Sequence, residues 1–426
     1  MGLTAFADIS YNSTTETYEI ASANGMRAFA DLVNGSACSV SDLTTSGGDS
    51  YFNFGKTNIS INGKLLQDID LGGIDAEGKG VAENEFTAIG TSNSSSYMYM
   101  GIFDGNGYKI SGLYINQAES NYQGLFGSIS GATIKNISVS GSITGKWYVG
   151  GIAGYIRESS SIENCYNEGS VYSSYRYVGG IVGYSSSSTV SDCYNEGLVE
   201  ANDQCVGGIA GDIISSTVER CYNKKSFYNS SRYVGGITGS ASGSTISECY
   251  NSGSIESTSD NETTVVGGIV GYINKSSGVP TTISNCYNTG SVKAKGNVGG
   301  ILGSDINEIS QEPYVFAVNN SYNIGSVSGE LNVGGVVGYS SLSKYAANYC
   351  YYDENEVAEV TGAVQGGNEN TSYGLSTDMM KSSATTEGSL LYYFTNESYG
   401  NSSEWVYDTN NINNGYPVLT WQTSNN

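Results

Sequence analysis

The chain has 426 residues, of which 38% are hydrophobic, and it carries a formal charge of −23. This length and hydrophobic content exclude a disordered chain and allow either several ordinary domains or one elongated array. The charge argues against nucleic acid and anionic membranes as partners, because phosphate binding needs clustered lysines and arginines. The sequence contains no histidine, which excludes Ser-His-Asp and Cys-His catalysis and histidine-ligated zinc within this chain. It has no run of 18 apolar residues, so we expect no membrane insertion.

The first element that the sequence predicts is a short helix over residues 24–34. Its apolar residues share one helical face, Asn24 is the candidate N-cap, and Gly35 follows as a terminator. We expect this helix to belong to an N-terminal cap, residues 1–56. An amphipathic helix there would cover the open edge of the first coil of the array that follows.

Residues 57–350 contain an internal repeat, which is marked by two triplets that recur at similar spacings. A Cys-Tyr-Asn triplet begins at Cys165, Cys193, Cys221, Cys249 and Cys286, and a Ser-Tyr-Asn variant begins at Ser321. Val-Gly-Gly triplets begin at Val149, Val178, Val206, Val234, Val266, Val298 and Val333, with spacings of 28 to 35 residues. A weaker upstream copy, "IKNISVSGSITG", places Ile137 in the cysteine position.

The repeat predicts strands that bury their apolar side by stacking. Each unit has isolated β-branched residues among Gly, Asn and Ser, and none has an apolar stripe long enough for a helix. A unit of about 28–35 residues cannot bury its own apolar side, whereas stacked units can. The predicted fold is therefore all-β, a parallel β-solenoid of about ten coils with a spacing of about 4.8 Å. We expect it to be right-handed.

Stacking predicts that equivalent residues of successive coils form ladders. One ladder is a column of buried, free cysteines, namely Cys165, Cys193, Cys221, Cys249 and Cys286. A second is a row of hydrogen-bonded amides, namely Asn167, Asn195, Asn223, Asn251, Asn288 and Asn323. Glycines of the "VGG" and "CYNxG" motifs are expected to supply positive φ and close approach at the bends.

Strand alternation places the tyrosine of each triplet on the face opposite the cysteine. We therefore expect an external column of candidate ligand-binding residues, namely Tyr166, Tyr194, Tyr222, Tyr250, Tyr287 and Tyr322. Exposed rings of this kind suit sugar stacking or contact with a protein. The alternative is that the rings serve only to stabilise neighbouring strands.

Residues 351–426 are predicted to form an irregular C-terminal cap. The large side chains near the end of the chain would close the last coil of the solenoid, namely Trp405, Tyr416, Pro417 and Trp421. A short helix is expected after Leu375, with Ser376 or Thr377 as its N-cap.

Several of these motifs resemble the GLUG-motif repeat family. They are "FTAIG" and "YMGIFDGNGYKISGLYIN" within residues 86–116, "GLFGSI" at 124–129, and the repeated "VGGIxG" and "NCYNxGxV". Similar repeats occur in the N-terminal region of bacterial immunoglobulin A proteases and in large surface proteins of Firmicutes. The resemblance implies an extracellular β-solenoid on a bacterial surface, and it implies no catalytic residue.

Candidate sites for chemistry are few. The cysteines lack the close CxxC spacing that metal sites use, so we expect no metal and no cofactor. Asp68 and Asp70 share a strand face, and Asp192 and Glu248 precede the triplet cysteines, where we expect a solvated surface. The "FDGNGY" stretch at 103–108 is interpreted as a tight turn rather than a calcium loop.

The sequence therefore favours a non-enzymatic, extracellular repeat protein on a bacterial cell surface. It would act as a surface stalk, an adhesin segment or a filament subunit, and bind a glycan, a host protein or sister subunits. The alternative is a polysaccharide-processing β-helix enzyme or a phage tail-spike-like protein with clustered carboxylates. Self-assembly through exposed ends or a lateral tyrosine face is a third hypothesis.

Overall fold

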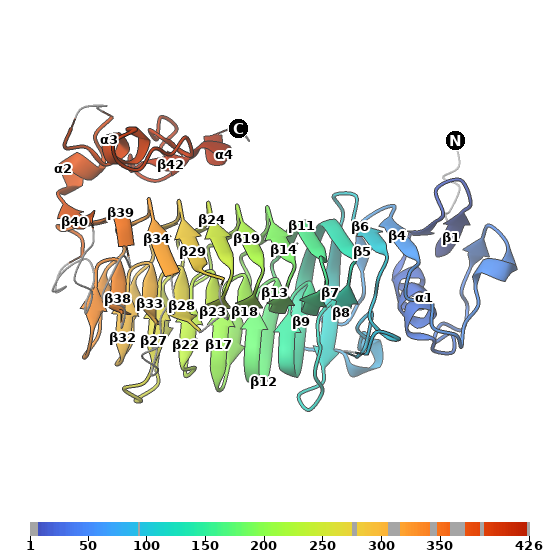
Figure 1. Ribbon diagram of the computed structural model, residues 1–426. Coiled ribbons are helices and arrows are strands. Elements are labelled where there is room, and N and C mark those ends of the chain that lie inside the picture. Colours follow the sequence, from blue (N-terminus) through green and yellow to red (C-terminus); the bar gives the residue numbers. More distant parts are fainter. Residues whose placement is uncertain are drawn as a thin grey trace. The chain divides into compact units, whose positions relative to one another are not determined.

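The computed structural model describes residues 7–92, 94–274, 279–305, 316–340, 347–357, 371–383 and 387–423. The chain divides into two compact units, Met1–Ala201 and Asn202–Asn426. Both are parallel β-solenoids, in which strands of successive coils pair in register within the unit (Figure 1). The predicted fold class is confirmed.

The first unit begins with a hairpin and a helix before its coils. Strands β1 and β2 pair antiparallel, and β2 then pairs parallel with β4, which starts the stacking. The elements of this region are β1 (Ile9–Asn12), β2 (Thr17–Ile20), α1 (Ala23–Asn34), β3 (Thr45–Ser46), the 3-10 turns η1 (Asp49–Tyr51) and η2 (Ala82–Asn84), and β4 (Asn62–Leu65).

Helix α1 packs its apolar face on the first coils. Phe29 is fully buried, with its ring 5.6 Å from Phe103 and 6.2 Å from Tyr99 between centroids. The N-cap is Ser22 rather than the predicted Asn24. Its backbone is extended and its hydroxyl accepts a hydrogen bond from the Gly25 N–H at 3.1 Å. Gly35 ends the helix with a left-handed φ of 73°, as expected for a C-terminal glycine.

The coils of the first unit form two sets of paired strands. One set carries the Cys-Tyr-Asn and preceding "VGG" segments: β5 (Ile69–Asp70), β6 (Ile102–Asp104), β7 (Lys109–Asn116), β9 (Thr133–Gly150), β11 (Ser161–Asn167), β12 (Ser170–Gly179), β14 (Thr189–Ser191), β15 (Tyr194–Asn195) and β16 (Val199–Ala201). The other set follows the paired glycines: β8 (Phe126–Ser130), β10 (Ala153–Arg157) and β13 (Val182–Ser186).

The second unit repeats this arrangement with shorter strands. A third set of strands, each following the Cys-Tyr-Asn or Ser-Tyr-Asn strand of its coil, forms a separate four-stranded sheet. The first set is β17 (Gln204–Gly207), β19 (Thr217–Glu219), β20 (Tyr222–Asn223), β22 (Tyr233–Gly235), β24 (Thr245–Ser247), β25 (Tyr250–Asn251), β27 (Val265–Gly267), β29 (Thr281–Ser284), β30 (Tyr287–Asn288), β32 (Asn297–Gly299), β34 (Phe316–Asn319), β35 (Tyr322–Asn323), β37 (Val333–Gly334), β39 (Ala347–Asp353) and β40 (Thr371–Leu375). The third set is β21 (Phe227–Asn229), β26 (Ile255–Ser257), β31 (Val292–Lys293) and β36 (Val327–Ser328). The set after the glycines is β18 (Ala210–Ile214), β23 (Thr238–Ser242), β28 (Val270–Ile273), β33 (Leu302–Asp305) and β38 (Val337–Ser340).

The structure has about eight coils, fewer than the predicted ten or so. In the described residues, the set of strands on the glycine side has eight members, β8, β10 and β13 in the first unit and five in the second. Among the described residues before 117, this set receives isolated bridges, from Ile89 to Phe126 and from Tyr99 to Ile129, and no strand. Those early coils pair with one another through β4 to β7.

The interior of each coil is filled by the valine before the paired glycines and the isoleucine or valine after them. Both positions are fully buried from coil to coil in the second unit, at Val206, Val234, Val266 and Val298 and at Ile209, Ile237, Ile269, Ile301 and Val336. Neighbouring coils are linked by backbone hydrogen bonds, such as the one from Ile237 N to Ile269 O at 2.9 Å. Burial of branched side chains along the axis is the main stabilising contribution.

The repeated glycines allow neighbouring coils to approach closely, and they do not adopt a positive φ. None of the "VGG" or "CYNxG" glycines in the described residues has a left-handed φ, which corrects the expectation from the sequence. A Cβ at Gly236 would lie 2.1 Å from the Gly268 oxygen and 2.5 Å from Cγ of Asn251. The second glycine of the motif is therefore required because the next coil and the asparagine side chain lie directly against it.

The C-terminal part of the second unit consists of α2 (Thr377–Met380), α3 (Leu390–Thr395), β41 (Trp405–Val406), β42 (Val418–Leu419) and α4 (Thr420–Thr423). Ser376 caps α2 through the Met379 N–H, as one of the two predicted caps. Strand β40 extends the solenoid by pairing with β39, and the segment then turns back along the coils (Figure 1). Residues 387–423 form the C-terminal strap.

Candidate functional site

The tyrosine column predicted from the triplets begins in the first unit with a stacked pair. Tyr166 and Tyr194 are half-buried and lie with ring centroids 4.1 Å apart at 22°. The Tyr166 hydroxyl donates to Oδ1 of Asn164. Burial, and then the neighbouring Tyr194, raise the pKa of Tyr166 to about 12, so its hydroxyl stays a neutral donor at physiological pH. The two rings cover each other's facing sides, so those faces are not available to a ligand.

In the second unit, four tyrosines continue this motif as one stack. Centroid distances are 4.8 Å from Tyr222 to Tyr250, 4.9 Å from Tyr250 to Tyr287 and 5.2 Å from Tyr287 to Tyr322, with rings within 7° of parallel. The spacing follows the rise from coil to coil. Stacking within the ladder therefore uses the ring faces that sugar recognition would need.

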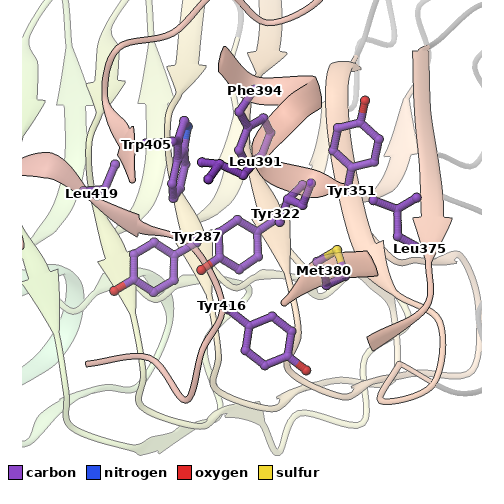
Figure 2. Packing of buried hydrophobic residues seen from close by; sticks show 11 residues of the cluster. Tyr287, Tyr322, Tyr351, Leu375, Met380, Leu391, Phe394, Trp405, Tyr416 and Leu419 are labelled. Atoms are coloured by element: carbon purple, nitrogen blue, oxygen red, sulfur yellow. The ribbon is translucent and has the colours of Figure 1, made fainter. Parts of the chain in front are cut away.

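The strap covers most of this stack. Figure 2 shows Trp405, Phe394 and Leu391 packed against Tyr287 and Tyr322. Tyr287 is 2% exposed and Tyr322 is fully buried, so the expected exposure is wrong for these two residues. The sequence indicates the strand face correctly but contains no signal for a later segment lying on it.

Polar contacts fix the strap in register with the tyrosines. The Tyr322 hydroxyl donates to the Pro417 oxygen at 2.5 Å and accepts from Nδ2 of Asn413 at 2.6 Å. Nε2 of Gln422 donates to the Tyr287 hydroxyl at 2.8 Å. The C-terminal aromatic residues therefore lie along the side of several coils, which corrects the expectation that they close the last coil.

The asparagine ladder is a chain of buried amides. In the first unit Asn167 Nδ2 donates to Asn195 Oδ1 at 2.8 Å. In the second unit the same bond runs from Asn223 to Asn251 to Asn288 to Asn323, at 2.7–2.8 Å. Each of these amides also donates to the carbonyl two residues later, as from Asn251 to Gly253 at 2.8 Å. These side chains are satisfied within the fold, so they stabilise the stack and leave no donor for a ligand.

The cysteine column lies inside the coils. All eight cysteines of the chain are free, and all except Cys38 are buried, Cys205 included. Cys165 pairs in register with Ile137, as the weak upstream copy predicts. The Cys165 thiol contacts the Glu163 carbonyl oxygen at 3.2 Å. The backbone N–H of Cys165 donates to the sulfur of Cys193 at 3.4 Å. Burial, together with the adjacent thiols, raises the pKa of Cys249 well above its ordinary value, which makes that thiol unreactive.

The carboxylates singled out from the sequence bind backbone or occupy bends. Oδ1 of Asp68 accepts from Lys109 N and Oδ1 of Asp70 from Gly72 N, both at 2.9 Å. Asp192 and Glu248 have left-handed φ values of 55° and 53°, as do the residues before the triplet in other coils. This position is therefore a left-handed bend in each coil, where the identity of the side chain matters less than the backbone conformation.

The "FDGNGY" stretch is a turn, as interpreted from the sequence. Asp104 Oδ1 accepts from Asn106 N at 2.8 Å and from Nδ2 of Asn136 at 3.0 Å, and Asn106 has a φ of 56°. Across the described part of the chain, no three His, Cys, Asp or Glu side chains gather in a way that would hold a metal ion.

Two features of the first unit escaped the sequence prediction. Tyrosines before the "VGG" motif form another stack, from Tyr122 to Tyr148 to Tyr177, with 5.2 Å between successive centroids. A groove of about 610 Å³ lies at the Tyr122 end of this stack. The stack could have been predicted from the tyrosine that precedes the Val-Gly-Gly motif, as at Tyr148 and Tyr177. The groove could not have been predicted from the sequence, because its walls come from two segments that share no motif.

Comparison with known proteins agrees with the repeat assignment. The family model described as the GLUG motif matches residues 145–172 and 174–199. No curated protein shows significant similarity to the chain. A crystal structure described as a putative immunoglobulin A1 protease from Bacteroides ovatus is 18% identical, with a TM-score of 0.47 over 97% of this chain and 94% of that chain. The protein is thus a parallel β-solenoid that carries repeats of the GLUG motif.

Proposed function

We propose that the protein is a non-enzymatic, extracellular repeat protein that acts as a surface stalk or adhesin segment. One observation carries this proposal. The asparagines and cysteines that recur from coil to coil over residues 165–323 are consumed in packing and hydrogen bonding along the solenoid axis. The repeat thus supplies length and stiffness, and binding is left to surface features that differ between coils.

The composition of the surface supports the same role. Only 14% of the residues are charged and 35 are tyrosines, a composition that suits contact with glycans or with other proteins. In the part of the chain that the structure describes, no helix is long and apolar enough to cross a membrane.

The proposal is tested by locating the protein on cells of its source organism. Antibodies raised against the purified chain should label intact cells, and protease treatment of intact cells should remove the signal. Labelling that appears only after permeabilisation would overturn the proposal.

A separate assay addresses the alternative of polysaccharide processing. Incubation of the chain with neutral and acidic polysaccharides should release no reducing ends above a heat-denatured control. A reproducible release would replace the stalk by an enzyme. Light scattering over a concentration series distinguishes a monomeric stalk from a self-assembling filament subunit.

A further inference from the structure

The groove in the first unit lies between two segments of the chain. Residues 85–91 form one wall and residues 117–123 the other, and the lining includes Glu85, Thr87, Thr91, Gln117, Asn121 and Tyr122. A second hollow of about 210 Å³ shares Glu85, Phe86 and Thr87 with it, so the two adjoin along one wall.

Both walls are held by backbone hydrogen bonds to the coils. Phe86 N donates to Tyr114 O at 2.8 Å and Ile89 N donates to Leu125 O at 3.0 Å. On the other wall, Tyr122 N donates to Trp147 O at 2.9 Å. The groove is therefore preformed, and binding would cost little conformational entropy.

Tyr122 is the first ring of its stack, and it lines the groove. Its ring lies parallel to Tyr148 at 5.2 Å and meets Tyr155 edge-on at 5.8 Å. No other ring of the described residues contacts Tyr122. One ring face is thus left without an aromatic partner, in contrast to Tyr250 or Tyr287, which stack on both sides.

The polar lining suits a neutral ligand with many hydroxyl groups. Glu85 Oε1 accepts from Asn116 N at 2.8 Å and from Gln117 Nε2 at 2.9 Å, which orients both side chains. The remaining polar lining consists of amides and hydroxyls, and the groove lining contains no Lys or Arg. Arg27, in the adjoining hollow, donates to the carbonyls of Glu85, Leu71 and Asn84. An anionic ligand would therefore meet a carboxylate and no uncommitted cation among the groove residues.

We infer that this groove binds a neutral oligosaccharide, with one sugar ring stacked on Tyr122 and hydroxyls bound by the Gln117, Asn121 and Thr87 side chains. The inference rests on the proposed function and names the ligand class and site that the stalk presents. An aromatic face with a few amides and one carboxylate is the combination that provides both apolar contact and orientation in a concave site.

The test measures binding of xylohexaose, mannohexaose and chitohexaose to the full chain by calorimetry, with hexagalacturonate as the anionic comparison. The variant Tyr122→Asn removes the ring, and asparagine tolerates the left-handed φ of 61° at this position. The matched control is Tyr177→Asn, which has φ 64° and belongs to the same stack but does not line the groove. Both variants are first checked for unchanged circular dichroism and melting.

At least one neutral hexasaccharide should bind with a dissociation constant below about 1 mM. Tyr122→Asn and Gln117→Ala should each weaken binding about tenfold or more, whereas Tyr122→Phe and Tyr177→Asn retain it. The inference is overturned if no neutral hexasaccharide binds, if hexagalacturonate binds as tightly, or if the two asparagine variants lose affinity equally. Surface labelling of cells is independent of these results, so failure here leaves the stalk proposal standing.

Discussion

The indole of Trp421 lies against Tyr250 with ring centroids 6.2 Å apart, and its Nε1 donates to the Glu248 carbonyl at 3.3 Å. The ring of Trp405 is tilted against Tyr322, with centroids 5.3 Å apart, and its Nε1 donates to Oδ1 of Asn285 at 3.3 Å. Two tryptophans near the end of the chain thus hold the strap on tyrosines of earlier coils. The strap covers a repeated face that would otherwise expose a row of aromatic rings.

Loss of Trp405 should release the strap. The side chain is 2% exposed and contacts Phe394, Tyr287 and Tyr322, so Trp405→Ala should destabilise strap docking by about 3–5 kcal/mol. Hydrogen exchange of residues 387–423 should then accelerate. The half-buried Trp421 provides the comparison, since Trp421→Ala should have a smaller effect. Unchanged exchange of the strap in Trp405→Ala would contradict this account.

Replacing one asparagine of the ladder should lower the stability of the second unit. Asn251→Ala removes the acceptor of the Asn223 amide and the donor to Asn288, and we expect a cost of about 2–4 kcal/mol because both groups remain buried. Native-state hydrogen exchange of β20, β25 and β30 measures this cost. Ser252→Ala, an exposed neighbour, should change stability by less than about 0.5 kcal/mol. Equal effects of the two substitutions would rule out a structural role for the ladder.

Asp212 should make stability depend on pH. This carboxyl is buried on β18, and burial raises its pKa from 3.8 to about 6, despite hydrogen bonds from Ser240 and from the backbone of Ile213. Because the folded pKa lies above the unfolded one, stability should fall as pH rises from about 4 to about 6 and stay lower above that range. The loss is about 3 kcal/mol.

The variant Asp212→Asn isolates this effect. It should be more stable than the parent at pH 7 and similar at pH 3.5, which denaturation at the two pH values measures. Asp70→Asn, at an exposed position, serves as the control and should show no such difference. A parent-to-variant difference that does not change with pH would disprove the role of Asp212 ionisation.

Thiol reactivity should separate one cysteine from the other seven. Cys38 is half-buried and the rest are buried, so a water-soluble disulfide reagent should modify about one thiol in the native protein and all of them in guanidinium chloride. Cys38→Ser should abolish the native reaction. Rapid modification of several thiols in the native protein would mean that the cysteine column is accessible.

The left-handed bend before each triplet predicts a stabilising substitution. Glu248 has a φ of 53°, whereas Asn164 and Asn285 occupy the equivalent bend in other coils. Asparagine tolerates this conformation better than glutamate, so Glu248→Asn should stabilise the second unit by up to about 1 kcal/mol. Thermal unfolding measures the gain. A lower melting temperature would show that the Glu248 side chain contributes more than the bend costs.

The sequence alone determined the coil and its ladders. Alternation within Cys-Tyr-Asn places Cys165 inside and Tyr166 outside, and equal spacing brings Asn223 over Asn251, because both are local consequences of a strand period and a repeat length. The helix at residues 23–34 followed from its own apolar face and its terminal Gly35.

Only the tertiary structure decided which tyrosines remain accessible and where a ligand fits. Tyr166 and Tyr322 occupy the same place in the repeat, yet the strap buries Tyr322 through contacts with Trp405 and Pro417 that no spacing encodes. The groove beside Tyr122 likewise depends on two unrelated segments meeting at the end of a stack. A repeated sequence specifies the contacts that recur between neighbouring coils. The burial of particular tyrosines and the position of the groove depend instead on contacts between segments far apart in the chain, and such contacts do not recur from coil to coil.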